Sequence, residues 1–412
     1  MSEAQAHTHR PLAGLRVIEL SSFVAAPLGG MTLAQLGAEV IRVDPIGGGP
    51  DRDRWPRTAA GQSLYWSGLN KGKKSLTIDM KSEPGREIIR NLLRSGGRSS
   101  GILLTNAVGR SWLGYEQFRA LREDAIIVRV EGNWKGQAAV DYTVNAAVGF
   151  PTVTGPDGFA IPINHVLPAW DVTCGIYSAL AITTAVLNRQ TTGRGAHIRI
   201  ALEDVALATA GNLGLLSEAQ INETSRPRIG NHLYGGFGRD FTTLDGHKLM
   251  IVALTERHWA DLLDVTGQEH VVTALEKSLG IDFTREDDRY AYREVLAGLF
   301  QVWFESQSTQ EIEAALRPTS LLWARYRSFD EVVDPASTDV WDNPMMSMLT
   351  QPGIPTHLAP GSPIRFDDVP RTAEPAPELG AHNREILTTL MGFGERELGE
   401  LERKGVIGDT SR

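Results

Sequence analysis

Hydrophobic and polar residues alternate between two spacings over the first 130 residues. Short apolar runs predict strands, and they are separated by stretches whose apolar positions recur at helical spacing. Such alternation predicts an α/β fold in which helices cover both faces of a mostly parallel sheet. The expected strands are residues 15–20, 39–43, 76–79, 102–105 and 125–130, and the expected helices are 27–36, 83–94 and 116–122.

The middle of the chain predicts a longer helix at residues 171–190, because its apolar positions keep helical spacing. A strand at 197–201 and a helix at 204–220 follow. Glycines then punctuate short strand-like runs, and helical patterns succeed them. We therefore expect a second, smaller α+β domain at residues 226–340.

The rest of the chain is predicted to form one large domain. Residues 1–225 form its first part, and residues 341–412 complete it. Residues 343–379 are rich in Pro and Gly, which predicts a long extended connection. A last helix is expected to begin near His382.

Charge and cysteine content narrow the possible functions. The chain has 41 Lys and Arg against 50 Asp and Glu, a net charge of −9, which argues against nucleic-acid or anionic-membrane partners. Its single cysteine, Cys174, allows no intrachain disulfide and no Cys-rich metal site. No apolar run approaches the roughly 18 residues of a membrane span, and the polar N-terminus lacks a signal-peptide core, so we expect a cytoplasmic protein.

Asp171 is the first candidate for chemistry, and two interpretations of it stay open. It stands at the start of the long predicted helix, where Asp most often caps the helix by accepting a backbone hydrogen bond. A carboxylate there could also act as a nucleophile, because Asp with its usual pKa near 3.9 is already ionised at neutral pH. The residues alone favour the cap.

Two further motifs are weaker evidence for chemistry, because each only faintly resembles a nucleotide- or phosphate-binding motif. Gly47-Gly48-Gly49 follows the second predicted strand, whereas a dinucleotide fingerprint needs glycines after the first, so NAD binding is not expected. The cluster Lys71-Gly72-Lys73-Lys74 is either a solvated face, the commoner case, or a phosphate contact.

Several stretches together resemble the family III CoA-transferases over nearly the whole chain. They are PLAGLRVIEL (11–20), LAQLGAEVIRVD (33–44), LNKGKKSLTIDM (69–80), WDVTCGIYSALAI (170–182), TTGRGAHIRIALEDVAL (191–207) and ELGAHNREIL (378–387). The resemblance implies a Rossmann-like large domain, a smaller α+β domain and an interlocked homodimer. It also implies a CoA thioester as substrate, with no prosthetic group and no metal.

The resemblance assigns roles to individual residues. Asp171 matches the catalytic aspartate of the family, which moves the nucleophile interpretation ahead of the cap. A glycine loop over the active site is matched by Gly235, Gly236 and Gly238. The implied contacts to the nucleotide side of CoA are Arg42, Lys71, Lys73, Lys74 and Asn106.

Within the family, residues 23–49, 164–171 and 230–246 resemble the subgroup that moves CoA from the C1 to the C4 carboxyl of a mesaconyl (2-methylfumaryl) group. Such a substrate needs a cation for its free carboxylate, and Arg228 and Arg239 are the candidates. The alternatives are intermolecular transfer to a separate acid, a methylacyl-CoA racemase and a non-catalytic CoA-ester binding protein. Racemisation is disfavoured because residues 139–142 lack the His that racemases carry there.

Overall fold

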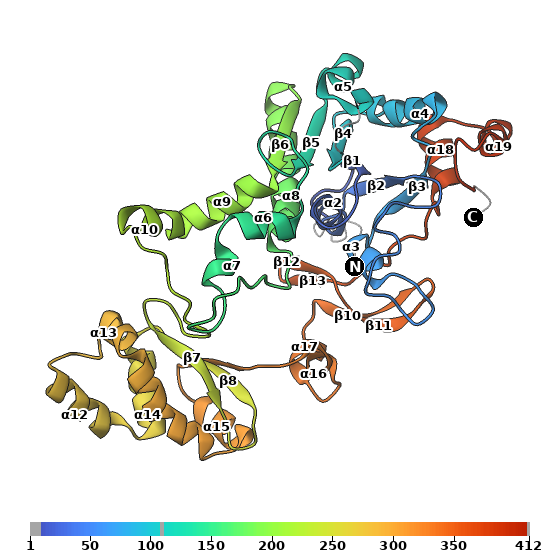
Figure 1. Cartoon of the computed structure of the whole chain (residues 1–412). Coiled ribbons are helices and arrows are strands. Elements are labelled where there is room, and N and C mark those ends of the chain that lie inside the picture. Colours follow the sequence, from blue (N-terminus) through green and yellow to red (C-terminus); the bar gives the residue numbers. More distant parts are fainter. Residues whose placement is uncertain (1–9, 108–110, 410–412) are drawn as a thin grey trace. The chain divides into compact units, whose positions relative to one another are not determined.

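A computed structural model describes residues 10–107 and 111–409 (Figure 1). The chain divides into two compact units, each formed from segments distant in sequence. Unit 1 contains the described residues of Met1–Val148, His165–Leu216 and Pro335–Arg412. Unit 2 contains Gly149–Asn164 and Ser217–Asp334.

Residues 149–164 therefore belong to unit 2, whereas the sequence prediction placed them in the large domain. The side chain of Arg228 explains the difference, because it donates hydrogen bonds to the carbonyl oxygens of Pro151, Thr152 and Ile161. Gly230 N–H also donates to the carbonyl of Gly155. These long-range bonds tie the segment to unit 2 and have no signature in local sequence.

A parallel sheet forms the centre of unit 1, as predicted. Within the described residues it has six strands in the order β3-β2-β1-β4-β5-β6. Chain order reverses between β1 and β4, and ligands of open α/β sheets bind at the carboxyl edge of such a point. The strands are β1 (Arg16–Leu20), β2 (Glu39–Asp44), β3 (Lys74–Thr77), β4 (Ile102–Thr105), β5 (Ile126–Glu131) and β6 (Ala196–Ala201).

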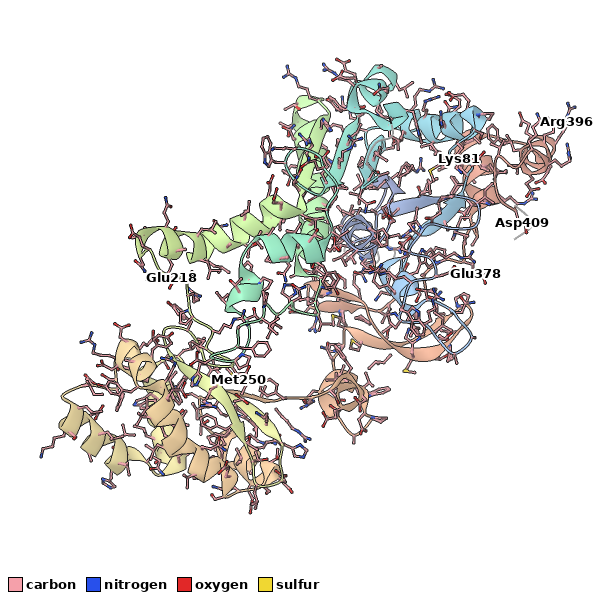
Figure 2. The ribbon with its side chains drawn as sticks, viewed as in Figure 1. Lys81, Glu218, Met250, Glu378, Arg396 and Asp409 are labelled. Atoms are coloured by element: carbon pink, nitrogen blue, oxygen red, sulfur yellow. The ribbon has the colours of Figure 1, made fainter. Side chains whose placement is uncertain are left out.

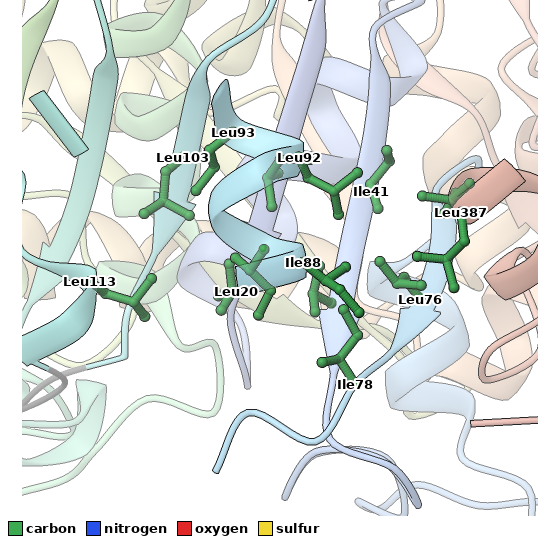
Figure 3. Packing of buried hydrophobic residues seen from close by; sticks show 14 of the residues in the cluster. Leu20, Ile41, Leu76, Ile78, Ile88, Leu92, Leu93, Leu103, Leu113 and Leu387 are labelled. Carbon is green, nitrogen blue, oxygen red and sulfur yellow. The ribbon is translucent and has the colours of Figure 1, made fainter. Parts of the chain in front are cut away.

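One face of this sheet carries the main hydrophobic core of unit 1 (Figure 3). Helix α4 (Glu83–Arg94) covers it with an apolar stripe that includes Ile88 and Leu92, and Ser82 caps the helix by accepting from Gly85 N–H. Burying such a stripe is the main source of stability for a surface helix. The same face is covered by α5 (Tyr115–Leu121), α18 (Asn383–Met391) and α19 (Glu395–Arg403).

Helices α2 (Ala25–Gln35) and α8 (Ala169–Thr192) pack against the opposite face and against each other. Two glycines allow the close approach. A Cβ on Gly175 would lie 2.8 Å from the Ala25 carbonyl oxygen, and one on Gly29 would lie 2.9 Å from the Gly175 carbonyl oxygen. The first turn of α2 is thereby fixed beside the first turns of α8.

Helix α8 is 24 residues long and apolar enough to cross a membrane by length and composition, although no single apolar run in the sequence suggested one. Its packing against α2, β5, β6 and α9 in unit 1 accounts for the apolar residues on one side.

The predicted helix at 204–220 is two helices, because Gly214 takes a φ of 80° between them. They are α9 (Leu202–Asn212) and α10 (Leu215–Ile221); the remaining short helices before α8 are α3 (Leu64–Leu69), η1 (Ser111–Leu113), α6 (Asp141–Ala147) and α7 (Phe150–Val153).

Unit 2 has its own sheet and core, in keeping with the predicted α+β domain. In the described part of the chain its three antiparallel strands are β7 (Phe237–Thr242), β8 (Lys248–Ala253), which carries Met250 in Figure 2, and β9 (Leu322–Arg325). Buried aromatic rings such as Phe237 and Phe300 fill the core between sheet and helices. Besides α7 and most of α10, its helices are α11 (Glu256–Thr266), α12 (Glu269–Leu279), α13 (Glu286–Ala291), α14 (Arg293–Glu305), α15 (Thr309–Leu316) and α16 (Phe329–Val333).

The Pro- and Gly-rich segment is not simply extended, so that prediction was wrong. It forms two antiparallel hairpins before the chain reaches α18, where Asn383 hydrogen-bonds to the backbone and side chain of Thr77. Gly353, with a φ of 72°, makes the tight turn of the first hairpin. The elements are α17 (Thr338–Trp341), β10 (Met346–Gln351), β11 (Ile354–Pro360), β12 (Ser362–Phe366) and β13 (Val369–Arg371).

Candidate active site

Asp171 lies in the first turn of α8, but it does not cap that helix. The N-cap residue is Pro168, which makes no side-chain cap bond. Asp141, at the start of α6, instead accepts hydrogen bonds from the backbone N–H groups of Trp170 (2.7 Å) and Asp171 (3.1 Å) through one carboxylate oxygen. The cap interpretation of Asp171 was therefore wrong, because a residue thirty positions earlier performs that task.

The carboxylate of Asp171 is consequently available for other chemistry. Burial raises its pKa to about 7, the negative charge of Asp141 adds to the rise, and the positive charge of Arg54 opposes it. Within residues 10–107 and 111–409, no donor is hydrogen-bonded to this carboxylate. A desolvated carboxylate without hydrogen bonds is a stronger nucleophile than one in water.

Three side chains border this part of unit 1. The guanidinium of Arg54 lies over the ring of Phe23 (5.3 Å to the centroid) and over the ring of Tyr65 (5.2 Å). Burial raises the pKa of Tyr65 to about 12, Arg54 opposes this rise, and Asp171 adds to it. Tyr65 thus remains a neutral phenol beside the carboxylate at physiological pH.

Arg42 supports the loop that carries Phe23. Its side chain is 1% exposed and pairs with Asp44 (2.9 Å) and Asp51 (2.9 Å). Asp51 also accepts the backbone N–H of Phe23, whose φ of 67° is unusual for an aromatic residue. The predicted contact between Arg42 and CoA stays a prediction, whereas its role beneath this loop follows from these bonds.

The three lysines of the predicted phosphate cluster have different surroundings. Lys73 is buried, and its ammonium contacts Glu19 (2.8 Å), the Pro27 carbonyl and Asn70; burial lowers its pKa to about 8. Lys71 donates to the Pro360 carbonyl (2.7 Å), and burial lowers its pKa to about 8 as well. Lys74 is partly exposed and pairs with two glutamates. Their predicted contacts to CoA stay predictions.

Asn106 lies where chain order reverses in the sheet. Its amide accepts from the N–H of Ser22 (3.0 Å) and donates to the carbonyl of the same residue (2.7 Å), so it joins the loops after β4 and β1. A cavity of about 190 Å³ opens here, lined by both loops and by Gly49. Its place at the carboxyl edge of the sheet is the one that nucleotides occupy in open α/β folds.

The other predicted site residues belong to unit 2. Gly235, with a φ of 79°, and Gly236 form the turn before β7, and Gly238 lies on that strand. Arg228 is engaged by the three carbonyl oxygens described above, and Arg239 lies 3.7 Å from Glu294. Their predicted roles at the substrate stay predictions.

Sequence reasoning missed Asp141, Arg54 and Tyr65. Of these, only Asp141 could have been found from the sequence, because it stands thirty residues before Asp171, in the stretch where racemases carry their His. Arg54 and Tyr65 lie in an ordinary loop and a short helix, and nothing local relates them to α8. Among the residues that the structure describes, no group of three His, Cys, Asp or Glu side chains is arranged to hold a metal ion.

A family model described as CoA-transferase family III matches residues 12–383. The chain belongs to CoA-transferase family III. This confirms the resemblance drawn from the sequence, and members of this family act on CoA thioesters.

Several known proteins are similar to this chain over nearly its whole length. 2-Methylfumaryl-CoA isomerase from Chloroflexus aurantiacus is 46% identical over 403 residues, which cover 97% of this chain and 98% of that protein. Succinyl-CoA–D-citramalate CoA-transferase from the same organism is 28% identical over 97% of this chain and 98% of that protein. A CAIB/BAIF family protein from Brucella suis has the same fold, with a TM-score of 0.74 at 24% identity, covering 92% of this chain and 98% of that one.

Proposed function

We propose that this protein catalyses intramolecular CoA transfer between the C1 and C4 carboxyls of mesaconyl-CoA. The observation that carries the proposal is the half-buried carboxylate of Asp171, which accepts no hydrogen bond from the described residues, in a chain 46% identical over nearly its whole length to 2-methylfumaryl-CoA isomerase. Intermolecular transfer to a separate acid is the second candidate, favoured by the 28% identity to a two-substrate transferase.

The reaction divides into two exchanges at Asp171. In the first, its carboxylate attacks the thioester carbonyl, expels CoA thiolate and forms a mixed anhydride. The thiolate then attacks the anhydride at the Asp171 carbonyl, giving an aspartyl-CoA thioester and free mesaconate. In the second, the other carboxylate of mesaconate attacks that thioester, expels CoA thiolate and forms a new mixed anhydride. The thiolate then attacks the mesaconyl carbon of this anhydride, which gives the isomeric CoA ester and releases the Asp171 carboxylate.

Each addition places negative charge on a carbonyl oxygen, which needs donors nearby. The backbone N–H groups of Trp170 and Asp171, at the start of α8, already donate to Asp141. We therefore assign this task to the first turn of α2, which has no side-chain cap and lies against α8 at Gly175. Its orphan N–H groups also place the positive end of a helix dipole there.

The test of intramolecular transfer uses mesaconyl-CoA with excess isotopically labelled free mesaconate, and both isomers are followed by mass. We expect unlabelled product, because holding both carboxyls of one molecule in the site gives the acceptor a very high effective concentration. Label entering the CoA ester as fast as isomerisation would contradict the proposal and favour the two-substrate transferase.

We further propose that the protein is an interlocked homodimer, as its family implies. The supporting feature is an apolar surface formed by α8, α9 and the edge strand β6, with a hollow of about 610 Å³ and exposed side chains such as Leu180 (56% exposed) and Leu187 (65% exposed). Apolar surfaces of this kind mark protein interfaces. The long return of residues 335–412 to unit 1 is compatible with interlocked chains.

Charging this surface should damage the assembly. We expect Leu180→Glu/Leu187→Glu to lower the yield of soluble dimer and the melting temperature by about 5 °C or more, because two carboxylates would be buried without partners. Val302→Glu, at an equally exposed position of unit 2 (68% exposed), is the control and should behave as wild type. Sedimentation that finds a folded, active monomer at nanomolar concentration would contradict the dimer.

A further inference from the structure

Arg54 is an exposed cation that the fold holds in place without satisfying its charge. Its guanidinium lies between the rings of Phe23 and Tyr65, at 5.3 and 5.2 Å from their centroids. Among the described residues, its side chain makes no hydrogen bond and no ion pair. Stacking leaves the N–H edge of a guanidinium free, which is the edge that binds carboxylates in a bidentate manner.

The backbone of Arg54 is fixed on both sides. Its N–H donates to the carbonyl of Asp51 (3.2 Å), and its own carbonyl accepts from the hydroxyl of Ser63 (2.6 Å). Asp51 is in turn paired with buried Arg42. The cation is therefore preorganised, which lowers the entropy cost of binding an anion.

The same contacts place Arg54 beside Asp171. Phe23 stands two residues before the start of α2, and the first residue of that helix approaches α8 at Gly175, one turn after Asp171. Arg54 lies on Phe23, so it is close to the start of α2, the segment that approaches α8. The electrostatics agree, because the charge of Arg54 lowers the pKa of Asp171 against the effect of burial.

We propose that Arg54 binds the free carboxylate of the dicarboxylyl-CoA substrate, the end of the acyl group that is not bonded to CoA. The inference rests on the proposed function and identifies its specificity-determining residue. It differs from the expectation for Arg228 and Arg239, whose guanidinium groups already contact carbonyl oxygens or Glu294.

One cation can serve both exchanges because mesaconate carries a carboxylate at each end. While one end reacts at Asp171, Arg54 holds the other. After the first exchange it retains the free dianion until the second carboxylate attacks the aspartyl-CoA thioester. Arg54 acts as a fixed cation in both exchanges and transfers no proton.

The test compares Arg54→Met and Arg54→Lys with wild type, and Arg52→Met is the control. Arg52 is an exposed arginine of the same loop whose guanidinium donates to the Gly47 carbonyl. Acylation of Asp171 is followed by mass spectrometry with mesaconyl-CoA and with 2-methylcrotonyl-CoA, in which a methyl group replaces the free carboxyl. Labelled mesaconate measures escape of the diacid, and calorimetry measures binding of mesaconate alone.

We expect Arg54→Met to slow acylation from mesaconyl-CoA about 10- to 100-fold, the size of a lost charged hydrogen-bond pair. Acylation from 2-methylcrotonyl-CoA should change less than about threefold, since that ester offers no carboxylate to the cation. With Arg54→Met, label from free mesaconate should enter the CoA ester, and the affinity for mesaconate should fall about 10-fold or further. Arg54→Lys should give intermediate values, and Arg52→Met should match wild type.

Equal losses on both esters would overturn the proposal, because Arg54 would then act on Asp171 or on folding. Unchanged preference for the dicarboxylic ester would overturn it as well. Wild type that acylates Asp171 from neither ester would refute the proposed function instead. Mesaconate binding then still decides the role of Arg54, and equal affinities for wild type and Arg54→Met would exclude it.

Discussion

Asp171→Asn should abolish turnover while the protein stays folded. The amide cannot form the anhydride, so we expect kcat to fall about 10⁴-fold or more, as for other lost nucleophiles. The cap of α8 is untouched because Asp141 provides it. Turnover is measured by product mass, and folding by thermal unfolding.

The stability of this variant should also depend on pH in a defined direction. Burial raises the pKa of Asp171 to about 7 in the folded protein, so the folded state binds its proton more tightly than the unfolded chain does. Wild type therefore loses stability as pH rises from about 4 to about 7, and Asn removes that cost. We expect the variant to melt about 2 to 4 °C above wild type at pH 8 and not at pH 4.

The control is Asp330→Asn, an exposed Asp in the first turn of α16, which should keep full activity. Near-wild-type turnover of Asp171→Asn would remove Asp171 from the chemistry. Loss of folding would mean that its carboxylate supports α8 despite the absence of a cap bond.

Two substitutions at Asp141 should separate its hydrogen bonds from its charge. Asp141→Ala leaves two N–H groups of α8 without an acceptor in a buried place, which we expect to cost about 1 to 3 kcal/mol of unfolding free energy. The first turn of α8 would also shift, and we expect kcat to fall about 10- to 100-fold because reacting groups tolerate little displacement.

Asp141→Asn keeps an oxygen acceptor and removes the negative charge that raises the pKa of Asp171. Activity requires ionised Asp171, so kcat/KM of wild type should rise with pH around a midpoint near 7. In Asp141→Asn that midpoint should move to lower pH, although burial, the larger cause, remains. An unchanged midpoint would mean that the charge of Asp141 has no effect on the pKa of Asp171. A loss of unfolding free energy equal to that of Asp141→Ala would contradict the role of Asp141 as the cap of α8.

Local sequence determined much of the large unit. Apolar runs such as 102–104 and 125–128, separated by segments of helical spacing, predict parallel strands because burial on both faces favours nearly continuous hydrophobic residues. The helix at 171–190 is also correct, since it is long and strongly periodic. The exceptions depend on glycine and hairpin geometry: Gly214 divides one predicted helix, and residues 343–379 fold into two hairpins.

The nucleophile candidate came from sequence, but its surroundings came only from tertiary structure. The sequence by itself determined the alternation of strands and helices, the family and Asp171, because these are carried by residues adjacent in the chain or by ordered motifs. Tertiary structure alone decided that Asp141 caps α8 from thirty residues away and that the charge of Arg54 acts on Asp171. Such contacts depend on the approach of α2 to α8 at Gly29 and Gly175, and a distance between helices has no period in the sequence.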